Sequence, residues 1–99
     1  MKPLEYHPEA TAESREAIDW YWGRSPLAAL DFADELKSAL GRLQKSPQVC
    51  PSYLHGTRHS ILHRFPFSVV FRERLQDIQI IAVAHASRRP GYWAKRLSQ

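Results

Sequence analysis

Apolar residues recur at two different spacings along the chain, and the change of spacing divides it into a helical half and a sheet half. From Glu9 to Gly23, apolar and small residues return every three or four positions, which is typical of an amphipathic helix. A second helix is predicted from Pro26 to Lys45, with Ser25 at the capping position before it. Joined by a short link, the two helices should form an antiparallel hairpin with one shared apolar face.

Strand patterns follow in the second half. Phe67–Glu73 alternates between apolar and polar residues, whereas Ile78–His85 is apolar almost throughout, which is typical of a strand buried on both faces. Arg58–Arg64 is the third candidate, and the short connections between the three predict an antiparallel meander. A weaker strand, Pro3–His7, precedes the helices, and Pro90–Leu97 should form a turn or short helix across a sheet edge.

These elements give the order β-α-α-β-β-β. The fold class is therefore predicted to be α+β: a helical hairpin packed on a four-stranded, mainly antiparallel sheet, with a short carboxyl-terminal helix. The length of 99 residues fits one domain over residues 1–99, and neither a repeat nor a linker divides the chain.

The formal net charge of +4 conceals a strong asymmetry. Residues 1–54 hold six basic and eight acidic side chains, a balance of −2, whereas residues 55–99 hold eight and two, a balance of +6. Four of the five histidines also lie in the second half. This distribution indicates a polyanion or an acidic protein as the partner of the carboxyl-terminal half.

Other classes of protein are disfavoured by what the chain lacks. No apolar run approaches the roughly 20 residues that span a bilayer, and the first residues do not resemble a signal peptide. A single cysteine, Cys50, cannot form an internal disulfide, which agrees with a reducing cytoplasm. His59 and His63 share a strand face, but two ligands without a third do not make a metal site. We therefore expect a cytoplasmic protein without membrane contact, cofactor or metal.

The chain places its reactive side chains directly after the most apolar strand. His85, Arg88, Arg89, Tyr92 and Trp93 follow one another there, and together they offer proton transfer, phosphate binding and base stacking at one edge of the sheet. These are the groups that a small protein would use on nucleic acid.

Several ordered segments carry a more specific signal: His7-Pro8-Glu9-Ala10, Trp20-Tyr21-Trp22, Phe32 with Leu36, Leu40 and Pro47, Arg58, Arg64-Phe65-Pro66-Phe67-Ser68-Val69-Val70-Phe71, Ile80-Ile81-Ala82-Val83-Ala84-His85, and Arg88-Arg89-Pro90-Gly91-Tyr92-Trp93. In this order they resemble the RelE/ParE superfamily of type II toxin–antitoxin toxins, which includes plasmid stabilisation proteins. The resemblance implies a toxin neutralised by a cognate antitoxin. RelE-like members are metal-independent ribonucleases that cut messenger RNA on the ribosome, and ParE-like members inhibit DNA gyrase.

Metal-free RNA cleavage needs a base, an acid and cations that stabilise the phosphate. An imidazole titrates near neutral pH, so His85 is the candidate acid or base, while Arg64 and Arg88 could donate to phosphate oxygens. Tyr92 could stack on a base or donate a proton. Arg64, Arg88 and Tyr92 match by order the positions that the resemblance to RelE-like ribonucleases implies, and His85 resembles the histidine that some members use. The candidate nucleic-acid-binding residues are Arg58, Arg89, Lys95 and Arg96.

Each candidate also has a structural interpretation. His85 could cap its strand, Tyr92 and Trp93 could cover the sheet, and Arg88 and Arg89 could bind an acidic antitoxin. Arg58 and Arg64 could pair with the acidic helices. The acidic first helix is an argument against a ribosomal target. The set of histidine, arginine and tyrosine is an argument against gyrase as the target, because gyrase inhibitors do not need it. We therefore expect messenger-RNA cleavage somewhat ahead of gyrase inhibition, with a non-catalytic nucleic-acid- or antitoxin-binding module as the third alternative.

Overall fold

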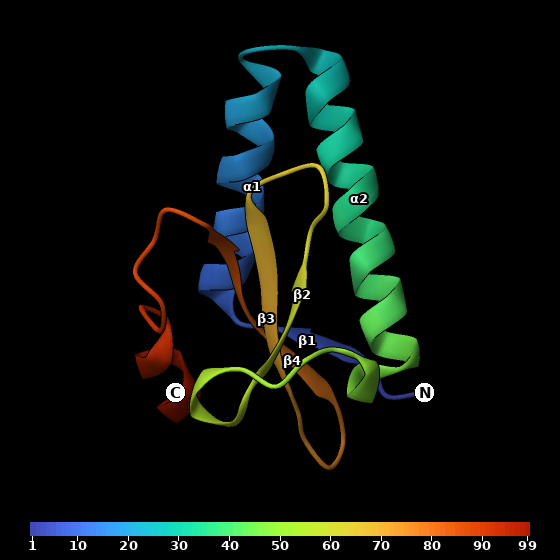
Figure 1. Cartoon of the computed structure of the whole chain (residues 1–99), viewed down its shortest axis with the longest axis vertical. Helices are drawn as coiled ribbons and strands as arrows, with labels where there is room; N and C mark the ends of the chain where they lie inside the picture. The colour runs from blue at the N-terminus through green and yellow to red at the C-terminus, as the bar shows by residue number, and fades with distance from the viewer.

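A computed structural model describes all 99 residues and contains two helices and four strands (Figure 1). In chain order the elements are β1 (Leu4–Tyr6), α1 (Pro8–Trp22), α2 (Pro26–Lys45), β2 (Arg58–Ile61), β3 (Phe67–Glu73) and β4 (Ile78–His85). Short 3-10 turns occupy Pro47–Val49, Leu54–Gly56 and Ala94–Ser98. The predicted order and fold class are confirmed, with a 3-10 turn as the carboxyl-terminal helix.

The four strands form one sheet in the order β1-β4-β3-β2. Strands β2, β3 and β4 form the predicted antiparallel meander, and β1 adds to β4 as a parallel edge strand. The pairing of β1 reaches only from Ile78 to Ile80 of β4, because the chain leaves the sheet at His7 to begin α1. The outer edge of β4 beyond Ile80 therefore has no strand partner.

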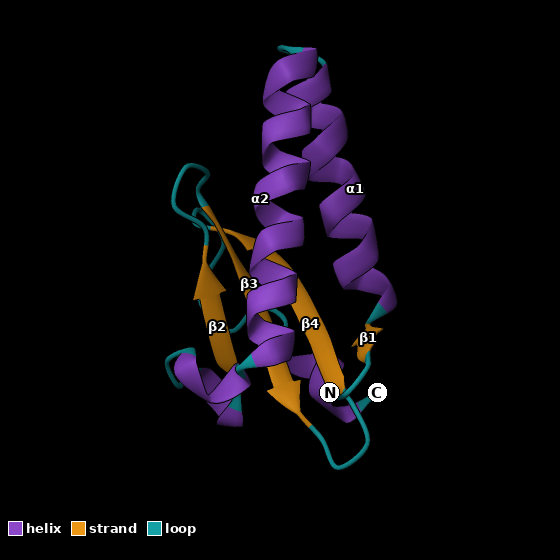
Figure 2. Cartoon of the chain, turned by 90° about the vertical axis from the view of Figure 1, so that its right-hand side faces the viewer, coloured by secondary structure: helices purple, strands orange, loops and turns teal.

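The helical hairpin covers one face of the sheet, as Figure 2 shows. His7 caps α1, since its Nδ1 accepts the backbone N–H of Glu9 at 3.1 Å. Ser25 caps α2 in the predicted way, with its Oγ accepting the N–H of Ala28 at 3.4 Å, and Pro26 occupies the first turn. Neither helix combines the length and the apolar character that crossing a membrane requires.

β2 is shorter than its sequence pattern predicts, ending at Ile61 instead of Arg64. The backbone N–H groups of His63 and Arg64 donate to the carboxylate of Glu35 on α2 and take no part in the strand ladder. Glu35, a buried acid of the helix layer, thus hydrogen-bonds the β2–β3 connection, and the strand ladder ends before it.

Two apolar clusters lie on the two faces of the sheet. The larger is formed with the helices and includes Phe32, Leu43, Phe71 and Ile80. The smaller lies on the opposite face, where Trp93 from the carboxyl-terminal segment packs on Val70, Ile81, Ala82 and Ala84. β4 is consequently buried on both faces, as its apolar sequence predicts, until it emerges at His85.

Candidate functional site

A cavity of about 400 Å³ opens between α1 and the carboxyl end of β4. Its apolar wall includes Trp20, Tyr21 and Phe67, while Glu13 and Glu16 on α1 face its interior. The far rim is made by three of the four predicted catalytic residues, which are His85, Arg88 and Tyr92. This cavity therefore joins an apolar recess to a small group of polar side chains.

A second cavity, of about 270 Å³, lies on the face of the sheet that the helices leave free. Aromatic side chains line it, with the ring of Tyr53 stacked on His59 at 3.9 Å between centroids. Five residues border both cavities: Pro66, Phe67, His85, Arg88 and Tyr92. These five residues form a ridge between the two cavities, which we call the central ridge.

His85 is exposed at the last position of β4, and its ring lies edge-on to Phe67 at 4.9 Å. Its Nδ1 accepts the backbone N–H of Ser87 at 3.0 Å and lies 2.8 Å from Ser87 Oγ. Because a backbone N–H can only donate, Nδ1 is the unprotonated nitrogen in this arrangement. His85 therefore presents its Nε2 to a ligand while Ser87 fixes the ring.

Tyr92 is less free than a catalytic proton donor would be. Its hydroxyl donates to the carboxylate of Glu13, and partial burial together with this hydrogen bond raises the pKa of Tyr92 well above its ordinary value. The guanidinium of Arg88 lies over the Tyr92 ring, 3.8 Å from its centroid. Tyr92 thus acts in this structure as a platform for Arg88.

Arg64 is separated from the other predicted catalytic residues. Its Nε donates to Glu35 at 3.1 Å, and its Nη1 lies 3.9 Å from Asp31, so the guanidinium faces α2 and lines neither cavity. Burial raises the pKa of Glu35, but hydrogen bonds from the His63 and Arg64 backbone and from the Arg64 side chain outweigh it and hold this pKa below its ordinary value. In this structure Arg64 is therefore paired with the acidic α2, while its side chain remains 59% exposed.

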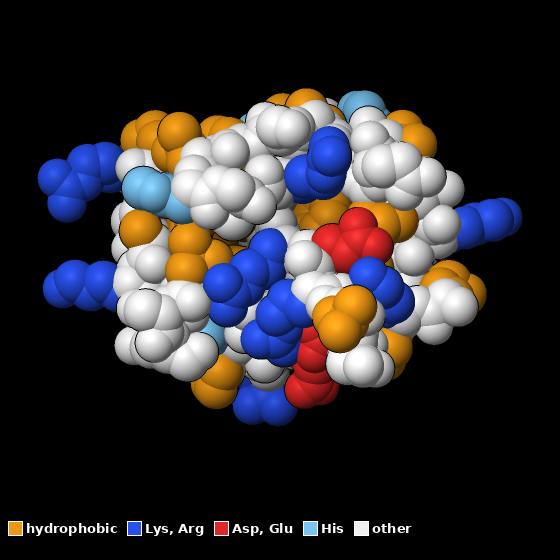
Figure 3. Space-filling view, turned by 90° about the horizontal axis from the view of Figure 1, so that it is seen from below, with side chains coloured by type: hydrophobic (Ala, Val, Ile, Leu, Met, Phe, Trp, Pro, Cys, Tyr) orange, Lys and Arg blue, Asp and Glu red, His pale blue; other side chains and the backbone are white.

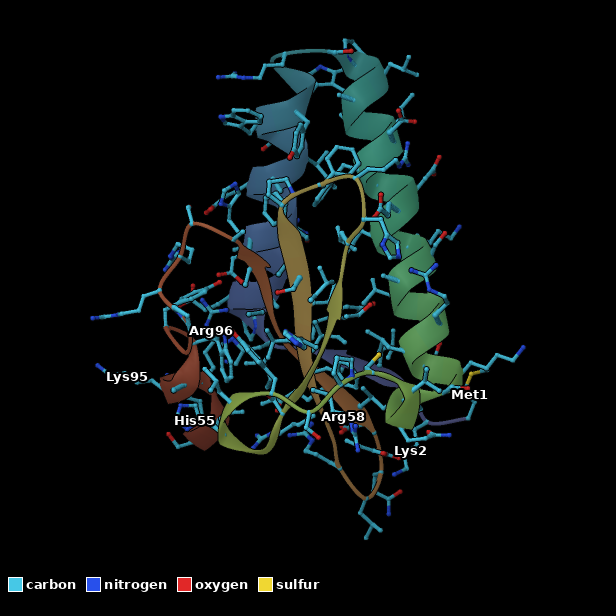
Figure 4. The ribbon with its side chains drawn as sticks, in the orientation of Figure 1. Met1, Lys2, His55, Arg58, Lys95 and Arg96 are labelled. Atoms are coloured by element: carbon cyan, nitrogen blue, oxygen red, sulfur yellow. The ribbon has the colours of Figure 1, made fainter.

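The four predicted nucleic-acid-binding residues fall into two groups. Arg58 donates to the backbone oxygen of Cys50 at 2.7 Å, and Arg96 is largely buried in an ion pair with Glu13, with Nη1 to Oε1 at 2.9 Å. Arg89 and Lys95 are exposed, and Figure 4 shows Lys95 pointing away from the molecule. Only Arg89 and Lys95 present a charge that is free of such internal bonds.

Two important residues, Glu13 and Glu35, are missing from the sequence-based candidates. In the sequence, Glu13 is one of several acids near the start of a helix. However, it lies three residues after Ala10 and four before Ala17, so it shares the buried face of α1 with them. Glu35 likewise lies between Phe32 and Ala39 on the buried stripe of α2. An acid on the apolar stripe of a helix is the signal that identifies both.

The histidines do not gather into a metal site. His59 is stacked on Tyr53, while His63 follows the end of β2 and is exposed. No group of three or more histidine, cysteine, aspartate or glutamate side chains could hold a metal ion.

Comparison with known proteins relates both the sequence and the fold to toxin–antitoxin systems. Residues 4–90 match the family described as "ParE toxin of type II toxin-antitoxin system, parDE". A chain of the solved structure "Chromosomal ParDE TA system from P. aeruginosa" is similar with a TM-score of 0.76 and 25% identity, over 88% of this chain and 98% of that chain.

A curated fungal protein is also similar in sequence. The FAD-dependent monooxygenase pynG of Aspergillus niger is 31% identical over 87 residues, which is 88% of this chain but 19% of the fungal protein. The chain thus spans about a fifth of that relative, too little for the comparison to define a family. The match over residues 4–90 covers most of the chain, and the chain belongs to the ParE toxin family of type II toxin–antitoxin systems.

Proposed function

We propose that this ParE-family toxin acts in the cytoplasm by binding and inhibiting DNA gyrase, and that its cognate antitoxin prevents this binding. The observation that carries the proposal is that two of the four predicted catalytic residues are already bonded to carboxylates of the helices. Arg64 is paired with Glu35, and the Tyr92 hydroxyl is bonded to Glu13. With these two side chains bonded inside the molecule, the site is better suited to binding a protein than to cleaving RNA.

The cavity beside α1 supports the same proposal. Its walls combine aromatic and aliphatic side chains with an exposed arginine at the rim, which is the composition typical of protein-binding hot spots. Inhibition by binding needs no proton transfer, so a tyrosine that keeps its proton and a histidine fixed by Ser87 are compatible with it. The ParE family membership of the chain favours gyrase as the target.

A supercoiling assay tests the proposal directly. We expect the full chain, made by cell-free synthesis, to inhibit supercoiling of relaxed plasmid by purified gyrase and to leave messenger RNA on translating ribosomes intact. The variant Arg88→Ala should inhibit more weakly because it removes the charge from the central ridge. Full gyrase activity at a large molar excess of the wild-type chain contradicts the proposal.

Ribosome-dependent RNA cleavage is the second candidate, and the geometry of His85 favours it. The Nε2 of His85 is free, and Arg88 lies near it on the central ridge. Under this alternative, His85→Ala should abolish loss of transcripts in cells, whereas Ser87→Ala should only weaken it. Double-strand DNA breaks with stable transcripts would instead support gyrase as the target. A chain that binds nucleic acid in low salt, with neither effect, fits the non-catalytic alternative.

A further inference from the structure

One carboxylate, that of Glu13, joins three parts of the molecule that are far apart in the sequence. Its Oε1 accepts the backbone N–H of Val83 on β4 at 3.0 Å, and its Oε2 accepts the hydroxyl of Tyr92. Both of its oxygens also bind Arg96, at 2.9 and 3.0 Å. The side chains of Glu13 and Arg96 are each only 13% exposed, so this is a largely buried and fully paired charge.

The location of Glu13 follows from the short β1 strand. Because β1 pairs with β4 only as far as Ile80, the next backbone groups on that edge of β4 have no strand to bond. Glu13 accepts the N–H of Val83, and Arg96 donates to the carbonyl oxygen of Ile81 at 3.0 Å. The ion pair therefore completes the sheet edge and fixes the carboxyl-terminal segment against it.

Tyr92 connects the ion pair of Glu13 and Arg96 to the central ridge, of which it is a part. The backbone turns at Gly91, whose φ of 81° is readily available to glycine, and Tyr92 then reaches back to Glu13 on α1. With its hydroxyl held, the ring presents one face to the guanidinium of Arg88 at 3.8 Å. Loss of the hydrogen bond between Tyr92 and Glu13 would free the Tyr92 ring to move, and Arg88 would lose the ring on which it lies.

Arg88 is the part of this assembly that is available to a partner. It is exposed, it forms none of the five ion pairs of the chain, and it borders both cavities. A guanidinium held on an aromatic ring keeps its donors directed outward and loses little conformational freedom when it binds a carboxylate. Such an arrangement suits recognition of an acidic side chain beside an apolar one.

We propose that Glu13 is a positioning residue: through Tyr92 it holds Arg88 at the central ridge, where Arg88 binds a carboxylate of the target protein. This role rests on the proposed function, because the target is taken to be gyrase. Glu13 lines the cavity, but each of its carboxylate oxygens already accepts two hydrogen bonds, from Val83, Tyr92 and Arg96, so it has no free acceptor to offer that target. It acts by holding the ring on which Arg88 lies.

The first test measures the position of Arg88 without any target. Protons above an aromatic ring are shifted upfield in NMR spectra, so the side-chain protons of Arg88 should be displaced upfield in the wild-type chain. We expect Glu13→Gln and Tyr92→Phe to lose most of this displacement, and the exposed-site control Asp19→Asn on α1 to keep it. Tyr92→Phe retains the Glu13–Arg96 ion pair, so it reports on the ring even if Glu13→Gln folds poorly.

The second test measures inhibition of gyrase by the same variants, with the concentration of folded chain determined for each. Glu13→Gln, Tyr92→Phe and Arg88→Ala should each raise the half-inhibitory concentration by about tenfold, which corresponds to the loss of one charge-assisted contact. The double variant Glu13→Gln/Tyr92→Phe should be no weaker than Glu13→Gln alone, because both changes break the same chain of contacts. Asp19→Asn should inhibit as the wild type does.

The outcomes separate this inference from the proposed function. If the wild type inhibits gyrase and folded Glu13→Gln inhibits equally well, Glu13 has only a structural role and the inference is overturned. Unchanged Arg88 shifts in Glu13→Gln and Tyr92→Phe overturn it as well. If the wild type leaves gyrase unaffected, the proposed function fails, and the NMR displacement still decides whether Glu13 positions Arg88.

Discussion

Two acidic side chains of the helical hairpin hydrogen-bond backbone groups that the sheet leaves unpaired. Glu13 accepts the N–H of Val83 at the open edge of β4, and Glu35 accepts those of His63 and Arg64 where β2 ends. Each carboxylate also pairs with one arginine. At the residue scale, the junction between helices and sheet therefore depends on two buried charges as well as on apolar packing.

Removal of the Glu35 charge should destabilise the fold. Glu35→Gln keeps one acceptor oxygen but loses the ion pair with Arg64, so we expect the free energy of unfolding to fall by about 2 kcal/mol. Urea denaturation measures this change. The neighbouring Asp34→Asn, at an exposed position of α2, should change the unfolding free energy by no more than about 0.5 kcal/mol. Equal effects of the two substitutions would show that Glu35 is not a structural anchor.

The same residue predicts a pH dependence. The pKa of Glu35 is lowered in the folded chain from an ordinary value of 4.5, so its ionised form stabilises the fold above that value. This stabilisation is lost as the pH falls below 4.5 and through the lower pKa of the folded state. The difference in unfolding free energy between the wild type and Glu35→Gln should be constant near neutral pH and shrink under acid. A difference that grows on acidification contradicts this assignment.

At the scale of elements, the carboxyl-terminal segment completes the core on the second face of the sheet. Trp93 is 1% exposed and is the largest side chain in the cluster with Val70, Ile81, Ala82 and Ala84. The segment is also tied to α1 through Arg96, and its last residue, Gln99, lies 2.7 Å from Nε2 of His7 at the start of that helix. It is therefore an integral layer of the fold.

Truncation of Trp93 tests this view of the segment. Trp93→Ala should lower the free energy of unfolding by about 3–5 kcal/mol, because it removes a large buried side chain and leaves a cavity. Trp22→Ala is the matched control, since Trp22 is 56% exposed on α1 and should cost little. Urea denaturation followed by circular dichroism compares the two. Similar losses for both variants would mean that the segment adds no core.

The elements are also where prediction from sequence succeeds best. Periodicity identifies both helices, the three strands of the meander and the two buried faces of β4, because each depends on residues close in the chain. The end of β2 and the separation of Arg64 from His85 depend on Glu35, which lies 28 or 29 residues away. The bond between Glu13 and Tyr92 spans 79 residues. Local patterns carry no information on such contacts, so the candidate site was only partly predictable.

At the scale of the whole molecule, charge is segregated between the two halves of the chain. The helical half is acidic on balance and the sheet half is basic, and Figure 3 shows basic side chains, with a few acidic ones, across the lower end of the molecule. On the sheet half, Arg74 is paired with Asp77, and Glu73 is paired with Lys2 from the first half of the chain. The exposed Arg88, Arg89 and Lys95 are left to attract an acidic partner over distance.

This segregation predicts how fast a partner binds. Arg89→Glu and Lys95→Glu should slow association with an acidic partner several-fold at low salt and have little effect on stability, because both side chains are exposed. Lys37→Glu, an equal change of charge on α2, is the control. Stopped-flow association measured over a range of salt concentrations tests the prediction. Equal rates for all three variants would show that the charge of the sheet half does not guide binding.

The parallel pairing of β1 with β4 also constrains how the chain is made. Leu4 pairs with Ile78, so the chain must be synthesised at least as far as Ile78 before β1 finds its neighbour. β4 lies between β1 and β3 and is the last strand to emerge from the ribosome. Contacts of such long sequence separation favour slow folding. The sheet should therefore form late, because β1 cannot pair, and the centre of the sheet is missing, until the chain has been made through β4.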